Sequence, residues 1–303
     1  MSEIAISVKN ISKKYGDIIA INNLSFEIKK GELYGFIGPD GGGKTTVFRI
    51  LTTLLTPDSG TVYVADFDVV NDYKKIRNIT GYMPGKFSLY QDLSVEENLK
   101  FFATIFGTTL EKNYDLIKDI YVQIEPFKKR PAGKLSGGMK QKLALCCALI
   151  HKPEILVLDE PTTGVDAVSR KEFWEMLKRL KESGITIIIS TPYMDEAGMC
   201  DRVSLIQGGN ILSTDTPANI IKGFNKQLFA VKTASMYLMM NDLRSWSNTE
   251  SIHLFGQYVH ITLNEGNQKD IESYLESKLH HSIEIKQQSP NIEDSFMRLM
   301  AKN

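Results

Sequence analysis

Apolar runs and segments with helical periodicity alternate along the first two thirds of the chain. Runs typical of strands are Ile4–Val8, Leu24–Ile28, Leu33–Ile37, Thr61–Val64, Ile155–Leu158, Ile185–Ile189 and Arg202–Ile206. Segments with the period of a helix are Lys44–Leu54, Val95–Phe106, Leu116–Ile124, Ser136–Ile150 and Val168–Lys181. The late strands are apolar almost throughout and alternate with helices, which predicts a parallel sheet covered on both faces. The early strands follow one another more closely and could form an antiparallel edge sheet.

Two changes in this pattern divide the chain. The section from about Asp92 to Pro131 is helical, so we expect an inserted helical subdomain at about residues 92–150. A helix start is expected at Thr216 and Pro217. Near Phe224 the pattern of apolar and polar positions changes to one of short strands and helices. The strands and helices expected there are Phe229–Val231, His253–Phe255, Tyr258–Thr262, Ser282–Ile285, Lys269–Lys278 and Ile292–Met300. We therefore predict an α/β domain over residues 1–223 and a small α+β domain over residues 224–303.

Composition and charge narrow the class of protein. Of the 303 residues, 42% are hydrophobic and 24% are charged, which is ordinary for a globular protein. Basic and acidic residues number 36 each, so the basic excess of nucleic-acid-binding domains is missing and no nucleic-acid partner is expected. The odd number of cysteines implies no disulfide framework, and we expect small buried residues at Cys146, Cys147 and Cys200.

The chain offers no sign of its own membrane anchor. Met1–Asn10 alternates apolar and polar residues and lacks the layout of a signal peptide. No apolar run approaches the ~20 residues that a membrane-spanning helix needs. Contact with a membrane is therefore expected only through a partner.

The strongest chemical motif is a glycine-rich loop between a predicted strand and a predicted helix. It satisfies the P-loop pattern G-x-x-x-x-G-K-[ST] and reads Gly38-Pro39-Asp40-Gly41-Gly42-Gly43-Lys44-Thr45. Such glycines let backbone N–H groups converge on phosphate oxygens at a positive helix N-terminus. We expect Lys44 to reach the β- and γ-phosphates of ATP, the Thr45 hydroxyl to hold Mg²⁺, and Thr46 to add a phosphate contact. The flanking strand and helix disfavour the alternative of a turn that binds nothing.

A second motif is an apolar strand that ends in two carboxylates. Ile155–Leu158 is followed directly by Asp159 and Glu160. Alone, such a pair would be interpreted as acidic residues ending a strand. In a chain with a P-loop, Asp159 suits a water-mediated contact with Mg²⁺, and Glu160 suits the general base that orients the attacking water.

A third motif lies between the other two and opens the Ser136–Ile150 helix. It reads Leu135-Ser136-Gly137-Gly138-Met139. The order of the three motifs resembles the ATP-binding cassette (ABC) family of ATPases over roughly residues 4–222. The resemblance implies a P-loop NTPase cassette with a parallel core sheet, an antiparallel β edge subdomain and the inserted helical subdomain. It also implies a head-to-tail dimer, in which Ser136, Gly137 and Gly138 face the γ-phosphate bound by a second cassette.

Other positions match the same family. The resemblance assigns Tyr15 to stacking on adenine, with an ordinary core or surface aromatic as the alternative. It places Asp166, in the loop after the acidic strand, at the dimer seam, and it makes Met194–Ala197 a helix start. The tail Pro290–Phe296 resembles the ending of exporter cassettes that carry a small C-terminal domain.

Three positions depart from the family pattern. Gly85, followed by Lys86, stands where a glutamine usually bridges Mg²⁺ and the attacking water. Pro192 stands where a histidine usually binds the γ-phosphate, and proline has neither a side-chain donor nor a backbone N–H. Met139 replaces the signature glutamine and cannot close a capping box with Ser136. Removing one such preorganised group typically costs ~10²–10³ in rate. We therefore expect ATP binding to survive, whereas hydrolysis at this site could be slow.

Three interpretations of these departures remain open at this point. Glu160 could suffice in an active homodimer, or the chain could form the degenerate half of a heterodimer. Alternatively, Lys86 or the hydroxyls of Ser190 and Thr191 could replace the lost groups. Because Glu160 is retained, we favour ATP hydrolysis by the assembled complex over a pure binding module. We expect an ATP-binding and ATP-hydrolysing subunit at the cytoplasmic face of the cell membrane, which couples ATP-driven dimer closure to export through separate transmembrane permease subunits. By resemblance, Phe87 and Tyr90 are candidate contacts with the permease, although both could pack internally. The rivals are a regulatory cassette that hardly hydrolyses ATP and a soluble cassette of DNA repair or translation.

Overall fold

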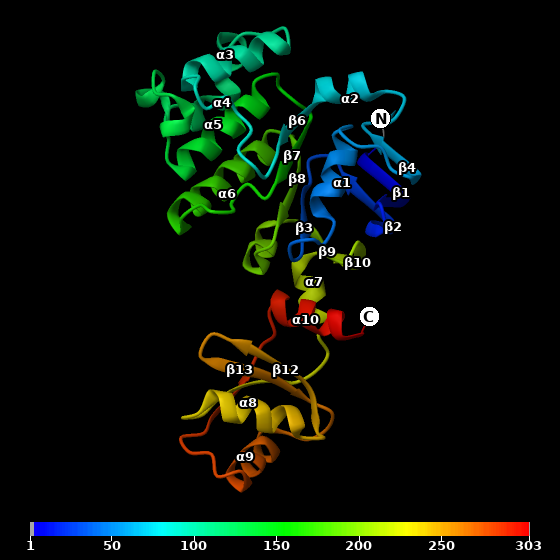
Figure 1. Cartoon of the computed structure of the whole chain (residues 1–303), viewed down its shortest axis with the longest axis vertical. Helices are drawn as coiled ribbons and strands as arrows, with labels where there is room; N and C mark the ends of the chain where they lie inside the picture. Colours follow the sequence, from blue (N-terminus) through cyan, green and yellow to red (C-terminus); the bar gives the residue numbers. More distant parts are fainter. Residues whose placement is uncertain (1–2, 303) are drawn as a thin grey trace. The chain divides into compact units, whose positions relative to one another are not determined.

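The computed structural model describes residues 3–302; residues 1, 2 and 303, which the predicted domains include, lie outside the described part. The chain divides into two compact units (Figure 1). The larger unit ends at Pro217 and the smaller begins at Ala218, whereas the sequence pattern places a boundary between residues 223 and 224.

In the described part of the chain, the larger unit contains a six-stranded sheet with the order β10-β9-β3-β8-β7-β6. Its strands are β3 (Leu33–Ile37), β6 (Thr80–Met83), β7 (Ile155–Asp159), β8 (Thr186–Thr191), β9 (Arg202–Gln207) and β10 (Asn210–Asp215). All neighbours pair in parallel except β10, an edge strand that pairs antiparallel with β9. The predicted parallel sheet is confirmed, and β10 is an addition that the apolar pattern did not indicate.

A second, antiparallel sheet has the order β2-β1-β4-β5. Its strands are β1 (Ile4–Tyr15), β2 (Ile18–Lys29), β4 (Ser59–Val64) and β5 (Phe67–Asp68). The predicted antiparallel edge sheet is confirmed, but the end predicted for β1, Val8, and the start predicted for β2, Leu24, are wrong. The strands continue through polar residues because cross-strand pairing extends to Tyr15 and Ile18, with register shifts that place polar side chains outward.

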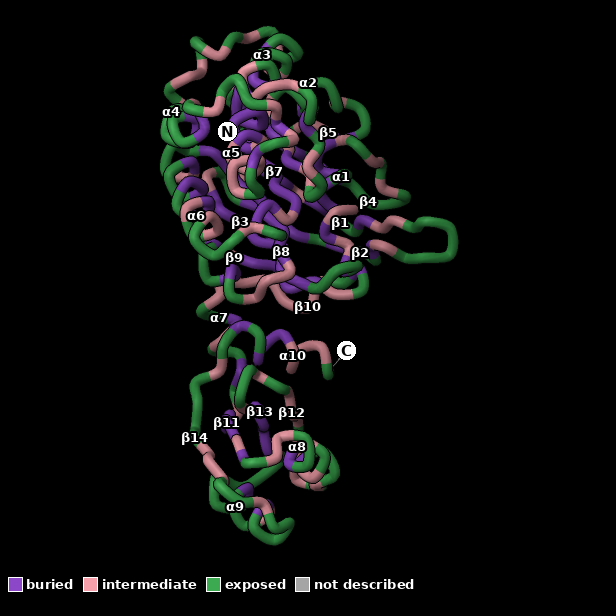
Figure 2. Tube along the Cα trace, turned by 60° about the vertical axis from the view of Figure 1, so that its left-hand side comes forward, coloured by how far each residue is buried: buried purple, intermediate pink, exposed green. Residues whose placement is uncertain are grey.

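The core of the larger unit lies between these two sheets. Helix α1 (Lys44–Leu51) packs there, and its buried Phe48 meets Phe36 of β3 edge to face, with 5.8 Å between ring centroids. Figure 2 shows the buried segments concentrated in the strands of this unit. Helices α5 (Gly137–Leu149) and α6 (Ala167–Glu182) lie on the other side of the strands from α1 (Figure 1). The cysteines are buried and unbridged, as expected.

Helices between β6 and β7 form the inserted segment. They are α3 (Val95–Ile105), α4 (Tyr114–Tyr121), α5 and the short 3₁₀ turns Glu111–Asn113, Glu125–Phe127 and Ala132–Lys134. Ser94 begins α3 with a complete capping box, in which Glu97 returns a carboxylate to the backbone of Ser94. Helix α2 (Tyr73–Ile79), which the periodicity did not reveal, buries only Ile76. None of the helices in residues 3–302 is both long and apolar enough to span a membrane.

The smaller unit has a sheet of its own, with the order β12-β13-β11-β14. Its strands and helices are β11 (Leu228–Lys232), α8 (Met236–Ser245), β12 (Thr249–Phe255), β13 (Tyr258–Leu263), α9 (Gln268–Ser277), β14 (Glu284–Gln288) and α10 (Ile292–Lys302). Helix α7 (Pro217–Lys222) begins at the predicted proline. The buried side chains of α8 and α9 pack with those of β11 and β13 in one apolar core. Helix α8 was not predicted from the sequence.

Candidate active site

The carboxyl ends of three neighbouring strands bring the predicted motifs together. Strands β3, β8 and β7 are parallel neighbours, so their ends meet at one edge of the core sheet. Ile37 pairs with Thr191 and Asp159 pairs with Ser190. The glycine-rich loop after β3, the acidic pair after β7 and the segment after β8 therefore share one site.

The glycine-rich loop wraps around the ammonium group of Lys44. This group donates to the carbonyls of Gly38 at 2.8 Å and Pro39 at 3.0 Å, and the side chain is only 3% exposed. Gly43 ends the loop with φ +100°, and a Cβ there would lie 2.5 Å from the Ala20 carbonyl oxygen. As the N-cap of α1, Gly43 offers no side-chain acceptor, which leaves the first N–H groups of the helix for an anion.

Glu160 lies directly beside this lysine. Its Oε1 is 3.1 Å from Lys44 Nζ, so the two side chains form an ion pair. The backbone of Glu160 has φ 49°, a left-handed conformation that non-glycine residues rarely adopt. Such backbone strain persists where the surroundings enforce it, and it is common at active sites.

Asp159 is buried and faces the start of α1. Its Oδ1 accepts from Ser190 Oγ at 2.7 Å and from Thr45 Oγ1 at 3.2 Å. A carboxylate beside a hydroxyl supplies the oxygen ligands that Mg²⁺ prefers, so these residues fit the predicted metal. Residues 3–302 contain no group of three or more acidic, histidine or cysteine side chains that could cage a metal. Sharing the ion with nucleotide phosphates is the arrangement that suits such a small ligand set.

The two departures at the edge of the site leave no polar side chain there. Gly85 lies against the end of β7, and a Cβ at this position would be 3.1 Å from the Asp159 carbonyl oxygen. Beyond β8, the Thr191 hydroxyl accepts from the backbone N–H of Tyr193 at 3.0 Å, and Pro192 adds no donor. The hydroxyls of Ser190 and Thr191 are thus engaged within the chain, while Lys86 is exposed.

A buried polar contact that the sequence did not indicate supports the two loops beyond β7 and β8. The Thr162 hydroxyl donates to Glu196 Oε2 at 3.0 Å. Arg170 of α6 lies 3.7 Å from the other oxygen of Glu196, and its guanidinium covers the Tyr193 ring at 4.5 Å. Glu196 lies in a short 3₁₀ helix, Met194–Met199, at the place where a helix start was expected. These residues are far apart in sequence, so no local pattern could have joined them.

The Ser136 segment lies apart from the glycine-rich loop. Ser136 begins α5 and its hydroxyl accepts from Met139 N at 3.4 Å. A Cβ on Gly138 would be 2.7 Å from Ser169 Oγ, so α5 closely approaches the start of α6. Asp166 caps α6, and the backbone N–H of Ser169 holds the pKa of its carboxyl below the usual value. Ser136 is the N-cap of α5, which lies on the other side of the core strands from α1 (Figure 1).

Tyr15 lies at the end of β1, in the hairpin that approaches the glycine-rich loop. It pairs with Ile18 across the turn and is 45% exposed. The next strand of the hairpin carries Ala20, whose carbonyl oxygen lies against Gly43. An exposed aromatic ring is therefore available on the hairpin that contacts the phosphate loop.

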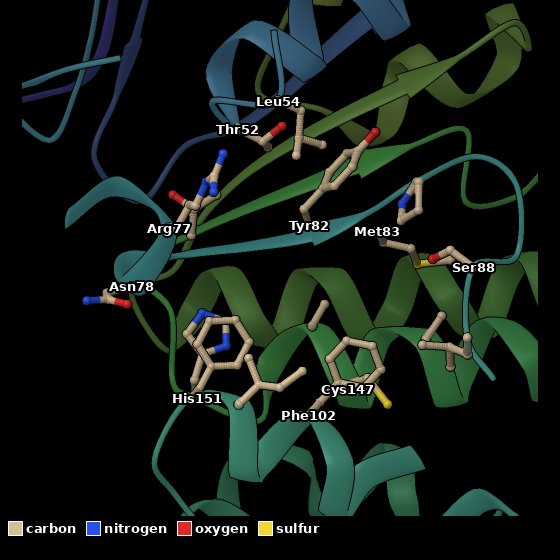
Figure 3. Close-up of a pocket in the computed structure, with 17 residues that line it drawn as sticks. Thr52, Leu54, Arg77, Asn78, Tyr82, Met83, Ser88, Phe102, Cys147 and His151 are labelled. Atoms are coloured by element: carbon tan, nitrogen blue, oxygen red, sulfur yellow. The ribbon is translucent and has the colours of Figure 1, made fainter. Parts of the chain in front are cut away.

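A cavity of about 440 Å³ lies between β6 and the inserted helices (Figure 3). Most of its lining is apolar, and the residues drawn include Leu54, Met83, Phe102 and Cys147. Ser88 and Leu89 line this cavity, whereas neighbouring Tyr90 packs against Phe101 and remains 51% exposed. Phe87 lies under the Lys140 ammonium at 5.6 Å.

Two ionisable groups in the cavity have shifted pKa values. Burial, followed by the nearby charge of Asp159, raises the pKa of Tyr82 to about 12. Burial lowers the pKa of His151, whose ring stacks on Phe106 with 3.8 Å between centroids. At neutral pH both rings are therefore uncharged.

Comparison with known proteins gives a consistent set of relatives. The family described as ABC transporter matches residues 21–163. "Probable multidrug ABC transporter ATP-binding protein YbhF" of Escherichia coli is 39% identical over 220 residues, which are 72% of this chain and 38% of that protein. The chain thus spans well under half the length of this relative.

A second relative aligns with nearly the whole chain. "Nod factor export ATP-binding protein I" of Sinorhizobium fredii is 32% identical over 307 residues, covering 99% of this chain and 87% of that protein. Among solved structures, the dimeric cassette MJ0796 in a post-hydrolysis state with ADP and Pi has a TM-score of 0.63 and 26% identity, covering 70% of this chain and 98% of that one.

Proposed function

This chain belongs to the ATP-binding cassette family of ATPases, and on that premise we propose that it powers export as the nucleotide-binding subunit of an ABC transporter. The observation that carries the proposal is the contact of Lys44 with Glu160 at the mouth of the glycine-rich loop, beside Asp159 and Thr45. Export as the direction of transport is carried over from the name of the Sinorhizobium relative.

Each residue of the site has a chemical role in this proposal. The loop N–H groups and Lys44 bind the β- and γ-phosphates. To contact the phosphates, the ammonium group of Lys44 gives up its ion pair with Glu160. Thr45 and Asp159 would hold Mg²⁺, which neutralises charge on the phosphate oxygens. Glu160, once released, accepts a proton from the attacking water while the scissile oxygen leaves with ADP. Tyr15 would stack on the adenine.

Family members dimerise, and a second cassette would complete the site. Ser136, Gly137 and Gly138 lie at the N-terminus of α5, a helix on the other side of the core strands from α1. They suit the γ-phosphate bound by the partner, with Asp166 beside them at the seam. The partner is a second copy of this chain or a different cassette.

The apolar cavity supports a docking site for the transmembrane subunits with which cassettes of this family work. It is bounded by β6 and α3 and includes Ser88 and Leu89, next to the expected contacts Phe87 and Tyr90. The exposed ring of Tyr90 beside Phe101 extends the apolar surface at its rim. Through this contact the chain would lie at the cytoplasmic face of the membrane.

The absence of side chains able to donate at Gly85 and Pro192 favours a second candidate. In it, the chain binds ATP and closes but hardly hydrolyses, and it lends Ser136 to a heterodimeric partner whose own site is complete. The groups that bind the nucleotide remain intact in this case, and only the groups that orient the γ-phosphate and water are missing.

Turnover separates the two candidates. ATP binding and steady-state phosphate release would be measured for the purified chain, alone and with its transmembrane partner, beside Lys44→Ala and Glu160→Gln. If the wild type turns over and both variants lose at least ~10²-fold, the site is catalytic. If ATP binds but turnover stays at background until a second kind of cassette is added, the regulatory candidate replaces it.

A further inference from the structure

Ser190 connects the two acidic residues of the site. It lies one residue before the end of β8, is fully buried and pairs with Asp159 of β7 in the sheet register. Its hydroxyl donates to Asp159 Oδ1 at 2.7 Å and accepts from the backbone N–H of Glu160 at 3.0 Å. One hydroxyl therefore contacts the side chain of the first carboxylate and the main chain of the second.

The chemistry of a hydroxyl fixes the direction of both bonds. Serine has one O–H donor, and an amide nitrogen can only donate. Ser190 must therefore give its proton to Asp159 while it accepts from Glu160. A hydroxyl bond to a carboxylate is short and about twice as strong as a neutral one, which agrees with the 2.7 Å separation.

The groups that Ser190 contacts make its hydroxyl important for both Asp159 and Glu160. The backbone amide of Glu160, which has φ 49°, is held by both the carbonyl (3.2 Å) and the hydroxyl (3.0 Å) of Ser190. The Asp159 side chain accepts from Thr45 as well, but the Thr45 hydroxyl would serve as a ligand of Mg²⁺ when the ion is bound. Ser190 then remains as the donor that orients Asp159, since Gly85 and Pro192 supply none.

We infer that Ser190 is a positioning residue that sets Asp159 against the metal and Glu160 against the attacking water. The inference rests on the proposed ATP hydrolysis for its kinetic part only. Hydrogen-bond partners of metal ligands typically change metal affinity or activity ~10–100-fold when removed.

The test compares Ser190→Ala with Ser190→Thr, which keeps the hydroxyl. Ser204→Ala is the matched control, because Ser204 is equally buried in β9 of the same sheet and bonds to Tyr34 and Thr214 away from the site. The affinity of the full chain for ADP would be titrated over a range of Mg²⁺ concentrations, and kcat and KM for ATP would be measured separately.

For Ser190→Ala we expect the Mg²⁺ concentration that supports ADP binding to rise ~10-fold or more and kcat to fall by a similar factor. Its ADP affinity without Mg²⁺ should match the wild type, and Ser190→Thr should recover both losses. The inference is overturned if Ser190→Ala behaves as Ser204→Ala, or if Ser190→Thr is as impaired as alanine. A wild-type chain without turnover would contradict the proposed function, yet the Mg²⁺ titration would still decide the role of Ser190.

Discussion

At the scale of single residues, Pro192 limits what the site can do to a bound nucleotide. It follows β8 beside Ser190 and Thr191 and offers no donor. We predict that Pro192→His raises ATP turnover at least ~10-fold, because one preorganised donor at a reacting phosphate is typically worth ~10²–10³ in rate. Phosphate release at saturating ATP measures the effect. Pro192→Ala is the control for loss of the ring, and a histidine variant no faster than alanine would contradict the prediction.

At Gly43, both the backbone conformation and the lack of space disfavour a side chain. Its φ is +100°, and a Cβ added there would lie 2.5 Å from the Ala20 carbonyl oxygen, so Gly43→Ala requires the loop to move. We expect nucleotide affinity to fall at least ~10-fold, since the loop N–H groups leave their convergent arrangement. Gly184→Ala, in the loop before β8, is the matched control: φ is +93° there and nothing lies within 4 Å. The control should cost about 1–2 kcal/mol of stability without changing affinity. Equal affinity in both variants, measured by calorimetry, would count against this account.

At the scale of elements, Asn98 of α3 organises the loop that leads to the inserted helices. It is fully buried; its Oδ1 accepts from Tyr90 N at 3.1 Å, and its Nδ2 donates to the carbonyls of Tyr90 and Ser94 at 3.0 Å and of Leu93 at 3.2 Å. This side chain therefore satisfies the backbone of the loop beside the cavity.

Removing that side chain should loosen the loop. We predict that Asn98→Ala lowers the free energy of unfolding by about 1–3 kcal/mol, because buried backbone groups lose their partners. Urea unfolding monitored by tryptophan fluorescence gives the value. Asn71→Ala, which removes one exposed bond to Asp68 at 3.0 Å, should stay within about 0.5 kcal/mol of the wild type. The prediction does not survive if the two variants are equally stable.

The elements that could be predicted from the sequence are those whose buried positions form a local pattern of apolar residues. The core strands β3 and β7 are buried at every position, so their apolar runs were unmistakable. Helix α8 was missed because Tyr237 and Leu238 are exposed while Met239 and Leu243 are buried, so apolar residues surround the helix and blur its period. The strand predicted at Ser282–Ile285 begins at Glu284 and runs into polar residues, because pairing with β11 defines this edge strand.

The residues of the candidate site also fall into those that the sequence could predict and those that it could not. The glycine-rich loop and the acidic pair could be assigned because each is contiguous and stands beside its own strand. The Ser190 hydroxyl and the contact of Thr162 with Glu196 join residues 31 and 34 positions apart, and only the parallel sheet brings them together. Sequence pattern indicated which groups react, whereas the fold determines what holds them in place.

At the scale of the whole molecule, we proposed that the Ser136 segment of one chain completes the nucleotide site of a second cassette. The proposed head-to-tail dimer can be tested at Gly137, where a Cβ would make only an ordinary 3.5 Å contact with the Gly164 carbonyl oxygen. An aspartate is favourable in the first turn of a helix, so the folded chain should tolerate it. The added charge would face the partner's γ-phosphate.

We therefore predict that Glu160→Gln forms a dimer in ATP on size-exclusion chromatography and that adding Gly137→Asp abolishes it, raising the dimer Kd at least ~10-fold through like-charge repulsion. Thermal unfolding of both proteins provides the control for folding. Gly138→Asp would not serve, because its Cβ meets Ser169 Oγ at 2.7 Å. A dimer that persists in the Gly137 variant would show that this surface does not face a partner nucleotide.

The ion pair between Lys44 and Glu160 has a consequence for how tightly the chain holds any nucleotide. The carboxylate occupies the same ammonium that a phosphate must use, so it behaves as a tethered competitive inhibitor of its own site. The affinity of every ligand is then the difference between the free energy of its own bond to the ammonium and that of the ion pair it displaces. Neutralising the residue as Glu160→Gln should strengthen the binding even of ADP, which lacks the γ-phosphate that the site acts on. Glu160, the proposed general base for hydrolysis of the bound nucleotide, would thus also weaken nucleotide binding.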